Sequence, residues 1–133
     1  MLKIKHIVNS VVVSEIVLQK GDFTIGRNTG NSLQLEDGVV SGEHAVLMVT
    51  PNQYLPEIFD VTIKDLNSTN GVYVNSKRIN ELKLKHDDVI SIGSHEFKVF
   101  DEAQFNASTQ TEYYVPDDEW ESLFEPLKVI TYE

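Results

Sequence analysis

The sequence has 133 residues, no cysteine and a formal net charge of −10 at pH 7. This length predicts one domain with a short extension, and the absence of cysteine excludes disulfides and cysteine metal sites. The first residues contain no long apolar run, so neither a secretion signal nor a membrane span is expected, which favours a cytoplasmic protein.

Charge is unevenly distributed along the chain. Residues 1–100 carry 10 Lys and Arg against 12 Asp and Glu, whereas residues 101–133 carry one Lys against nine acids. A binder of duplex nucleic acid is disfavoured, because no basic stripe is present to displace counterions from phosphates. The change in composition predicts a main domain at 1–100 and an acidic linker and C-terminal tail at 101–133.

Short apolar runs separated by turn residues predict an all-β main domain. Many short strands in about 100 residues favour a β-sandwich over a small barrel. Asn9 and Ser10 suit a two-residue hairpin, and Pro51 with Asn52 marks a turn. The expected strands cover residues 2–8, 11–18, 23–25, 32–35, 45–49, 57–64, 71–74, 82–84, 89–92 and 95–100.

The tail contains the segment VPDDEWESLFEPL, which predicts a short helix. Pro116 and the acids that follow it suit a helix start, and Trp120, Leu123 and Phe124 would share one apolar face. A helix this short is not stable in isolation, so we expect it to pack on its own domain or on a partner.

Three polar loops are expected to meet at one end of the sandwich. They are GRNTGNS at 26–32, DGVVSGEH at 37–44 and NSTNG at 67–71. A strand of about four residues separates the first two loops by roughly 13 Å. Two strands, at 45–49 and 57–64, would return the chain to the third.

This expected rim is rich in hydrogen-bond donors. It offers the guanidinium of Arg27, the hydroxyls of Ser41, Ser68 and Thr69, and the amide of Asn70. An arginine among many neutral donors suits a small tetrahedral oxyanion, above all phosphate.

The third loop has two expected tasks. Asn70 and Gly71 lie between two apolar runs, and this dipeptide predicts a tight hairpin turn. The preceding Ser68 and Thr69 would present donors, although Ser68 is equally suited to cap the loop by bonding its own backbone.

The order of these motifs resembles the forkhead-associated (FHA) domain family. The matching motifs are FTIGR at 23–27, SGEH at 41–44, DLNSTNG at 65–71 and VN at 74–75. The resemblance covers about residues 1–100. It implies a β-sandwich of about eleven strands whose loops at one end bind phosphothreonine peptides.

The resemblance also implies residue roles. Arg27 and Ser41 would bind phosphate oxygens, Thr69 would donate from its backbone or side chain, and Asn70 would bond the peptide main chain. Gly26 would let the chain turn. The positions expected to support the loops structurally are Gly26, His44, Gly71 and Asn75.

Positions beside the expected site depart from the family pattern. Gly42 and Glu43 stand where family members often carry basic residues, and Val39 offers no charge to an acidic residue of the peptide. Lys77 and Arg78 are alternative sources of specificity, and an apolar preference is equally consistent with the sequence.

The implied partner is a phosphothreonine protein, which requires a Ser/Thr kinase and involves no cofactor, metal, nucleic acid or membrane. Thr109 and Thr111 are candidate phosphorylation sites, so the ligand could also be the tail of this chain or of a neighbouring copy. The alternative function is a phosphate-independent scaffold that binds partners through a sheet face or the C-terminal tail.

Catalysis is not expected. The motifs HExxH, GxSxG and the P-loop are absent from the sequence. Ser41 and His44 lie three positions apart on one loop, where a nucleophile and its base are poorly placed to interact.

Overall fold

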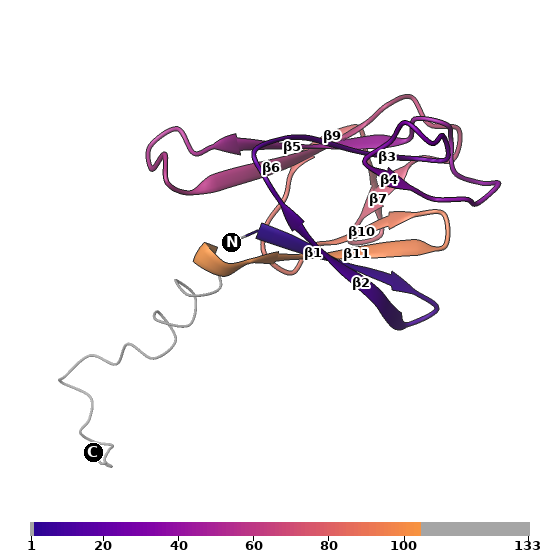
Figure 1. Ribbon diagram of the computed structural model, residues 1–133, viewed down its shortest axis with the longest axis horizontal. Helices are drawn as coiled ribbons and strands as arrows, with labels where there is room; N and C mark the ends of the chain where they lie inside the picture. The colour runs from indigo at the N-terminus through magenta and orange to yellow at the C-terminus, as the bar shows by residue number, and fades with distance from the viewer. Residues whose placement is uncertain (1, 105–133) are drawn as a thin grey trace, which may run out of the picture. The chain divides into compact units, whose positions relative to one another are not determined.

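The chain folds into a sandwich of two β-sheets, and the computed structural model describes residues 2–104. Figure 1 shows the two layers facing each other. The six-stranded sheet has the order β2-β1-β11-β10-β7-β8, and the five-stranded sheet has the order β4-β3-β5-β6-β9. The strands are β1 (Leu2–Val8), β2 (Val11–Leu18), β3 (Gly21–Gly26), β4 (Leu33–Gln34), β5 (Ala45–Pro51), β6 (Phe59–Asp65), β7 (Val72–Val74), β8 (Lys77–Ile79), β9 (Glu81–Lys83), β10 (Val89–Ile92) and β11 (His95–Asp101).

The core forms because strands such as β1, β6, β10 and β11 bury alternate side chains between the sheets. In β1, Leu2, Ile4 and His6 are buried, whereas Lys3 and Lys5 between them are less buried. Burying one large aliphatic or aromatic side chain contributes about 1.5–3 kcal/mol. The side chains most completely buried include Ile4, Ile25, Leu47, Ile63, Ile90, Ile92 and Phe97.

The prediction of an all-β sandwich is confirmed, and the predicted strands end within two residues of the observed ones. Asn9 and Ser10 form the expected hairpin turn, with φ of 52° and 66°. Positive φ at both positions matches the twist of the paired strands. β5 continues to Pro51, which was predicted as a turn, because the end of a strand tolerates the missing N–H.

One strand, β8, was not predicted. Val74 pairs with Lys77, which leaves Asn75 and Ser76 as a two-residue turn. Their φ values are 50° and 73°, so this turn repeats the Asn-Ser geometry of the first hairpin. The strand is too short and too polar to show alternation, and the Asn-Ser dipeptide was the available signal.

The predicted hairpin at Asn70 and Gly71 is wrong. β6 and β7 belong to different sheets, so residues 66–71 cross between the layers instead of joining paired strands. Gly71 has a φ of 88°, but Asn70 does not have a positive φ. A two-residue hairpin of this type requires positive φ at both central residues.

The predicted helix in the tail, together with Thr109 and Thr111, lies outside the described residues. Within residues 2–104, no helix has the length and apolar character needed to cross a membrane.

Candidate functional site

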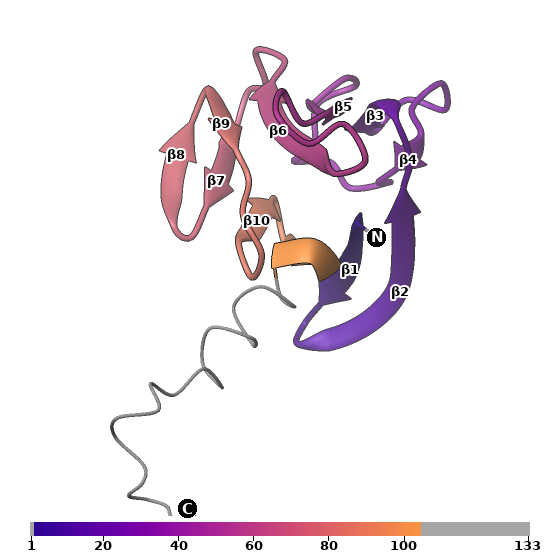
Figure 2. The ribbon, with the colours of Figure 1, turned by 90° about the vertical axis from the view of Figure 1, so that its left-hand side faces the viewer.

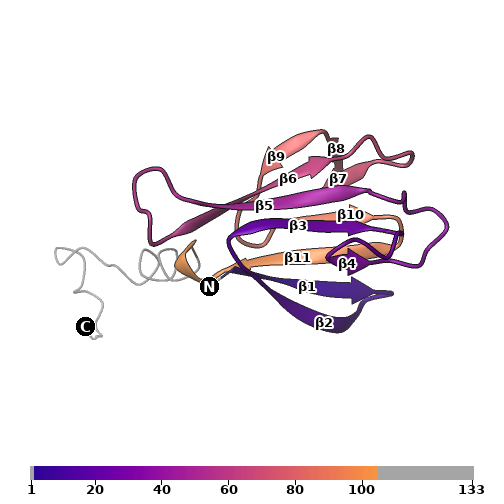
Figure 3. The same ribbon diagram turned by 45° about the horizontal axis from the view of Figure 1, so that its top comes forward.

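Three connecting segments meet at one end of the sandwich. The first begins at Arg27 after β3, the second joins β4 to β5 at residues 35–44, and the third joins β6 to β7 at residues 66–71. β5 and β6 are antiparallel, with Ala45 opposite Asp65, so the chain leaves this end along β5 and returns along β6. Figure 3 shows the segment after β3 at the right-hand end and the N-terminus toward the other end.

The three segments line a pocket of about 350 Å³, which we call the rim pocket. Arg27 comes from the first segment, Ser41 from the second, and Thr69 and Asn70 from the third. The other lining residues are Gly38, Val39, Val40 and Gly42. No carboxylate is among these lining residues, so the polar surface of the pocket favours an anion.

One side-chain nitrogen of Arg27 is hydrogen-bonded to the protein, and the other two are available to a ligand. Its Nε–H donates a hydrogen bond of 2.9 Å to the carbonyl of Val40, and its backbone N–H donates one of 2.9 Å to the carbonyl of Ser41. The terminal guanidinium nitrogens have no acceptor among residues 2–104, and the residue is exposed. An arginine positioned in this way presents two donors to phosphate oxygens.

Ser41 and Asn70 are each oriented by the neighbouring segment. The backbone N–H of Thr69 donates a 3.0 Å hydrogen bond to Ser41 Oγ, so the hydroxyl hydrogen is left to donate to a ligand. Asn70 Nδ2 donates to the carbonyl of Val39 at 2.8 Å. Its Oδ1 therefore stays available to accept from a peptide N–H.

His44 is completely buried and joins the second segment to the third. The backbone N–H of Ser41 donates to His44 Nδ1 at 3.0 Å, and His44 Nε2 lies 2.8 Å from the carbonyl oxygen of Gly71. Because a carbonyl can only accept, the proton resides on Nε2. Neither ring nitrogen bonds the Ser41 hydroxyl, so the two side chains are not arranged for proton transfer.

Ser68 is used within its own loop. Its side chain is buried, and its Oγ accepts a 3.0 Å hydrogen bond from the backbone N–H of Gly71. Its own N–H donates to Asp65 Oδ1 at 3.1 Å. Ser68 does not line the rim pocket, so of the two roles left open by the sequence, the geometry supports capping.

Gly26 is required for close packing, and not for a turn as the sequence interpretation held. It is the last residue of β3, and a Cβ placed on it would overlap the carbonyl oxygen of Gly42. The same Cβ would lie 2.7 Å from Nδ2 of Asn31. Since φ of Gly26 is not positive, the steric contact and not backbone freedom excludes a side chain.

Of the proposed specificity residues beyond the loops, the structure brings Arg78 near the rim but not Lys77. A Cβ on Gly71 would lie 2.7 Å from Arg78 Nε, so the Arg78 guanidinium covers this glycine. Lys77 and Asn75 lie at the opposite end of β7, where Asn75 Nδ2 donates to Asp88 at 2.9 Å. Asn75 therefore supports the β7–β8 turn and not the rim loops.

Asp37 orients the segment between β4 and β5, a role that was not predicted from the sequence. Its Oδ1 accepts from the N–H of Val39 at 3.1 Å, and its Oδ2 lies 3.3 Å from Ser94 Oγ and 3.4 Å from His95 Nε2. The Val39 hydrogen bond is the main cause that lowers the pKa of Asp37 below its usual value, and Ser94 and His95 add to it. The Asp-Gly dipeptide at 37–38 was the signal for this turn.

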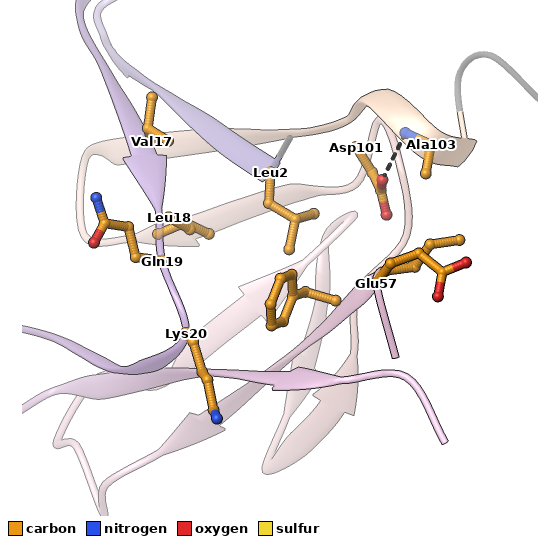
Figure 4. Close-up of a pocket in the computed structure, with 10 residues that line it drawn as sticks. Leu2, Val17, Leu18, Gln19, Lys20, Glu57, Asp101 and Ala103 are labelled. Atoms are coloured by element: carbon orange, nitrogen blue, oxygen red, sulfur yellow. Dashed lines mark hydrogen bonds between the residues drawn. The ribbon is translucent and has the colours of Figure 1, made fainter. Parts of the chain in front are cut away.

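A second pocket, of about 380 Å³, lies at the opposite end of β6 from the rim (Figure 4). Leu2 and the first residue of β6, Phe59, contribute to its lining. Its charged lining consists of Glu57, Asp101 and Lys20, which does not favour an anion. Among residues 2–104, no group of His, Cys, Asp or Glu side chains is arranged to hold a metal ion.

The chain matches the family model of the FHA domain over residues 23–93, which is more than half of its length. It belongs to the FHA domain family. The match includes every residue that lines the rim pocket. The resemblance inferred from the motifs is therefore confirmed, and with it an FHA fold in a family that binds phosphothreonine peptides.

Curated relatives of this FHA domain are longer proteins. The transcriptional regulatory protein EmbR of Mycobacterium tuberculosis is 38% identical over 81 residues, which is 60% of this chain and 19% of EmbR. Protein phosphatase 2C 70 of Arabidopsis thaliana is 29% identical over 124 residues, which is 85% of this chain and 19% of the phosphatase. The chain thus spans less than a fifth of either relative.

Solved structures share the same fold. EmbR of Mycobacterium tuberculosis in complex with a low-affinity phosphopeptide has a TM-score of 0.62 and 30% identity, covering 74% of this chain and 24% of the other. A structure from an analysis of phosphothreonine-dependent FHA domain interactions has a TM-score of 0.63 and 29% identity, covering 74% of this chain and 94% of the other.

Proposed function

We propose that this FHA domain binds phosphothreonine on a partner protein and acts in signalling or in the regulation of assembly. The observation that carries the proposal is the rim pocket, where Arg27, Ser41 and Thr69 from three separate segments offer donors to one space. A phosphothreonine brings about −1.5 to −2 charges at pH 7, which matches a pocket lined by a guanidinium and no carboxylate.

Each side chain has a specific part in the proposed complex. The open nitrogens of Arg27 and the hydroxyl of Ser41 bind phosphate oxygens. Thr69 donates from its side chain, because its backbone N–H is already bonded to Ser41. Asn70 accepts from the peptide main chain. Three charge-assisted hydrogen bonds of about 1.5–3 kcal/mol each correspond to dissociation constants between about 0.5 mM and 0.25 µM.

The proposal also covers the source of the ligand. A Ser/Thr kinase supplies the phosphothreonine, on a partner protein or on Thr109 or Thr111 of this chain or a neighbouring copy. In this arrangement residues 1–100 form the binding domain, and residues 101–133 form an acidic linker and tail. We place the protein in the cytoplasm as a non-catalytic module without cofactor, nucleic acid or membrane.

An oriented phosphothreonine peptide library tests this function directly. The phosphorylated peptides should bind at least about 100-fold more tightly than their unphosphorylated copies, because two or more charge-assisted bonds are lost with the phosphate. Equal binding of the two libraries would show that the rim pocket does not recognise phosphate.

One observation favours the alternative of a phosphate-independent scaffold. The edge strand β2 exposes the side chains of Val11, Val12, Val13 and Val17, each more than half exposed. Exposed apolar edges are common sites of protein association. Phosphatase treatment of a pulldown separates the two functions, since loss of the partner supports phosphate recognition and its retention supports the scaffold.

A further inference from the structure

A separate recess lies at the edge of the sandwich where the chain passes between the two sheets. β8 ends one sheet, β9 ends the other, and Asn80 is the single residue between them. Figure 2 shows β7, β8 and β9 together at this edge. The recess has a volume of about 430 Å³ and shares no lining residue with the rim pocket. We call it the edge groove.

The floor of the edge groove is apolar. Val74 from β7, Ile79 from β8 and Leu82 from β9 line it, so each of the three strands contributes one aliphatic side chain. Val74 is buried and Ile79 is half-buried, whereas Leu82 is 38% exposed. An apolar side chain entering the groove would therefore cover aliphatic surface that now faces water.

The walls of the edge groove carry three lysines, Lys77, Lys83 and Lys85. Lys83 Nζ lies 3.3 Å from Asp60 Oδ2, which neutralises part of its charge. Lys77 and Lys85 are exposed and have no carboxylate within ion-pair distance in the described part of the chain. These two ammonium groups are available to an anionic partner.

The carboxylate that lines the groove, that of Asp88, is already engaged. Asp88 is buried, its Oδ1 accepts from Asn75 Nδ2 at 2.9 Å, and its Oδ2 accepts from the backbone N–H of Lys85 at 2.7 Å. These bonds hold the loop before β10 and leave the lysines as the exposed charges of the groove. A local excess of positive charge is unusual in a protein with a net charge of −10.

We propose that the edge groove binds an acidic segment of a partner protein, with an apolar side chain between Asp or Glu residues. The apolar residue would pack on the floor while the carboxylates face Lys77 and Lys85, so shape and charge are both complementary. β8 and β9 are edge strands, and their outer backbone groups can pair with an extended segment. A nucleic acid fits less well, because the chain is acidic overall and phosphates would leave the floor uncovered.

Fluorescence anisotropy of the full chain with a labelled peptide, Glu-Asp-Leu-Phe-Asp-Glu, tests the proposal. One control peptide carries Gln and Asn in place of the acids, and a second carries Ser in place of the two apolar residues. Both controls should bind at least about tenfold more weakly, because the first lacks the negative charges and the second lacks the apolar side chains. Equal binding of either control would overturn the proposal.

Variants locate the binding surface. Lys77→Glu combined with Lys85→Glu should weaken binding of the acidic peptide at least about tenfold, whereas Lys64→Glu, an exposed lysine of β6, should leave it unchanged. Arg27→Ala should also leave it unchanged, so the outcome does not depend on phosphothreonine recognition. Unaltered binding to the double variant would contradict the proposal.

Nuclear magnetic resonance of the unmodified chain provides a test that needs no variant. The amide signals of Ile79 and Leu82 should shift when the acidic peptide is added. If they shift with protein concentration in the absence of peptide, a second copy occupies the groove and the proposal is wrong. The proposal also fails if Asp117→Asn with Glu119→Gln shifts them, since the chain's own acids would then fill the groove.

Discussion

The backbone N–H of Thr69 lies 3.0 Å from Oγ of Ser41 and donates a hydrogen bond to it. This bond joins two segments of the rim and determines the direction of the Ser41 hydroxyl, whose hydrogen is left for a ligand. Ser41 therefore both joins two segments of the pocket and offers a hydrogen-bond donor to the ligand.

Ser41→Ala should weaken phosphothreonine peptide binding by about 1.5–3 kcal/mol, because a charge-assisted hydrogen bond is lost. The free energy of unfolding should fall by about 0.5–1.5 kcal/mol, since Thr69 loses its acceptor. Isothermal titration calorimetry and urea unfolding measure the two effects. Unchanged peptide affinity would show that the Ser41 hydroxyl does not contact phosphate.

Ser68→Ala should reduce the free energy of unfolding more than it reduces peptide affinity. The buried hydroxyl accepts from the Gly71 N–H, so its loss leaves a buried donor unsatisfied and should cost about 1–3 kcal/mol of unfolding free energy. The variant should bind phosphopeptide more tightly than Ser41→Ala does, because Ser68 does not line the rim pocket. The same two measurements decide this, and a larger affinity loss for Ser68→Ala would assign it to the ligand.

Arg27→Ala should lower phosphothreonine peptide affinity by about 2–4 kcal/mol, or roughly 30- to 1000-fold, because its guanidinium is the cation of the rim pocket. Arg78→Ala is the matched control, since Arg78 covers Gly71 but does not line the pocket. Calorimetry should find a loss below about 1 kcal/mol for this control. Equal losses for the two arginines would remove Arg27 from its assigned role.

Gly26→Ala should reduce the free energy of unfolding by about 1–3 kcal/mol or more, because the new Cβ overlaps the backbone of Gly42. Gly30→Ala is the control, since a Cβ there meets no atom within 4 Å and φ is not positive. It should change stability by less than about 1 kcal/mol. Chemical denaturation of both variants checks this prediction, which fails if they are equally stable.

Stability should fall on mild acidification because of His6. Burial, followed by repulsion from His95, lowers the pKa of His6 below its usual 6.5. The folded protein therefore favours the neutral form of His6. The contribution of His6 to the free energy of unfolding is fully present above pH 6.5 and decreases as the pH falls from 6.5 toward the folded pKa. Urea unfolding between pH 7.5 and 5.5 should show a smaller decrease for His6→Gln than for the unmodified protein. Parallel pH curves would contradict this assignment.

Short-range patterns were sufficient for much of the fold. Alternating apolar residues located most strands, and the turn at Asn9 and Ser10 was found, because both depend on neighbours within a few positions. The order of the loop motifs was also sufficient to recognise the FHA family and to expect Arg27 and Ser41 at one rim. The strand β8 was not predicted because it is short and two of its three residues are charged.

Contacts between residues far apart in the sequence determined the features that short-range patterns did not predict. Ser68 and Thr69 are adjacent and chemically alike, yet one is buried as a cap and the other lines the pocket. The crossing of residues 66–71 between the sheets imposes this difference, and a local pattern predicts a hairpin there instead. The contacts of Gly26 with Gly42 and of Asp37 with His95 arise in the same way. They depend on how strands from distant parts of the chain pair and pack, which no stretch of a few residues encodes.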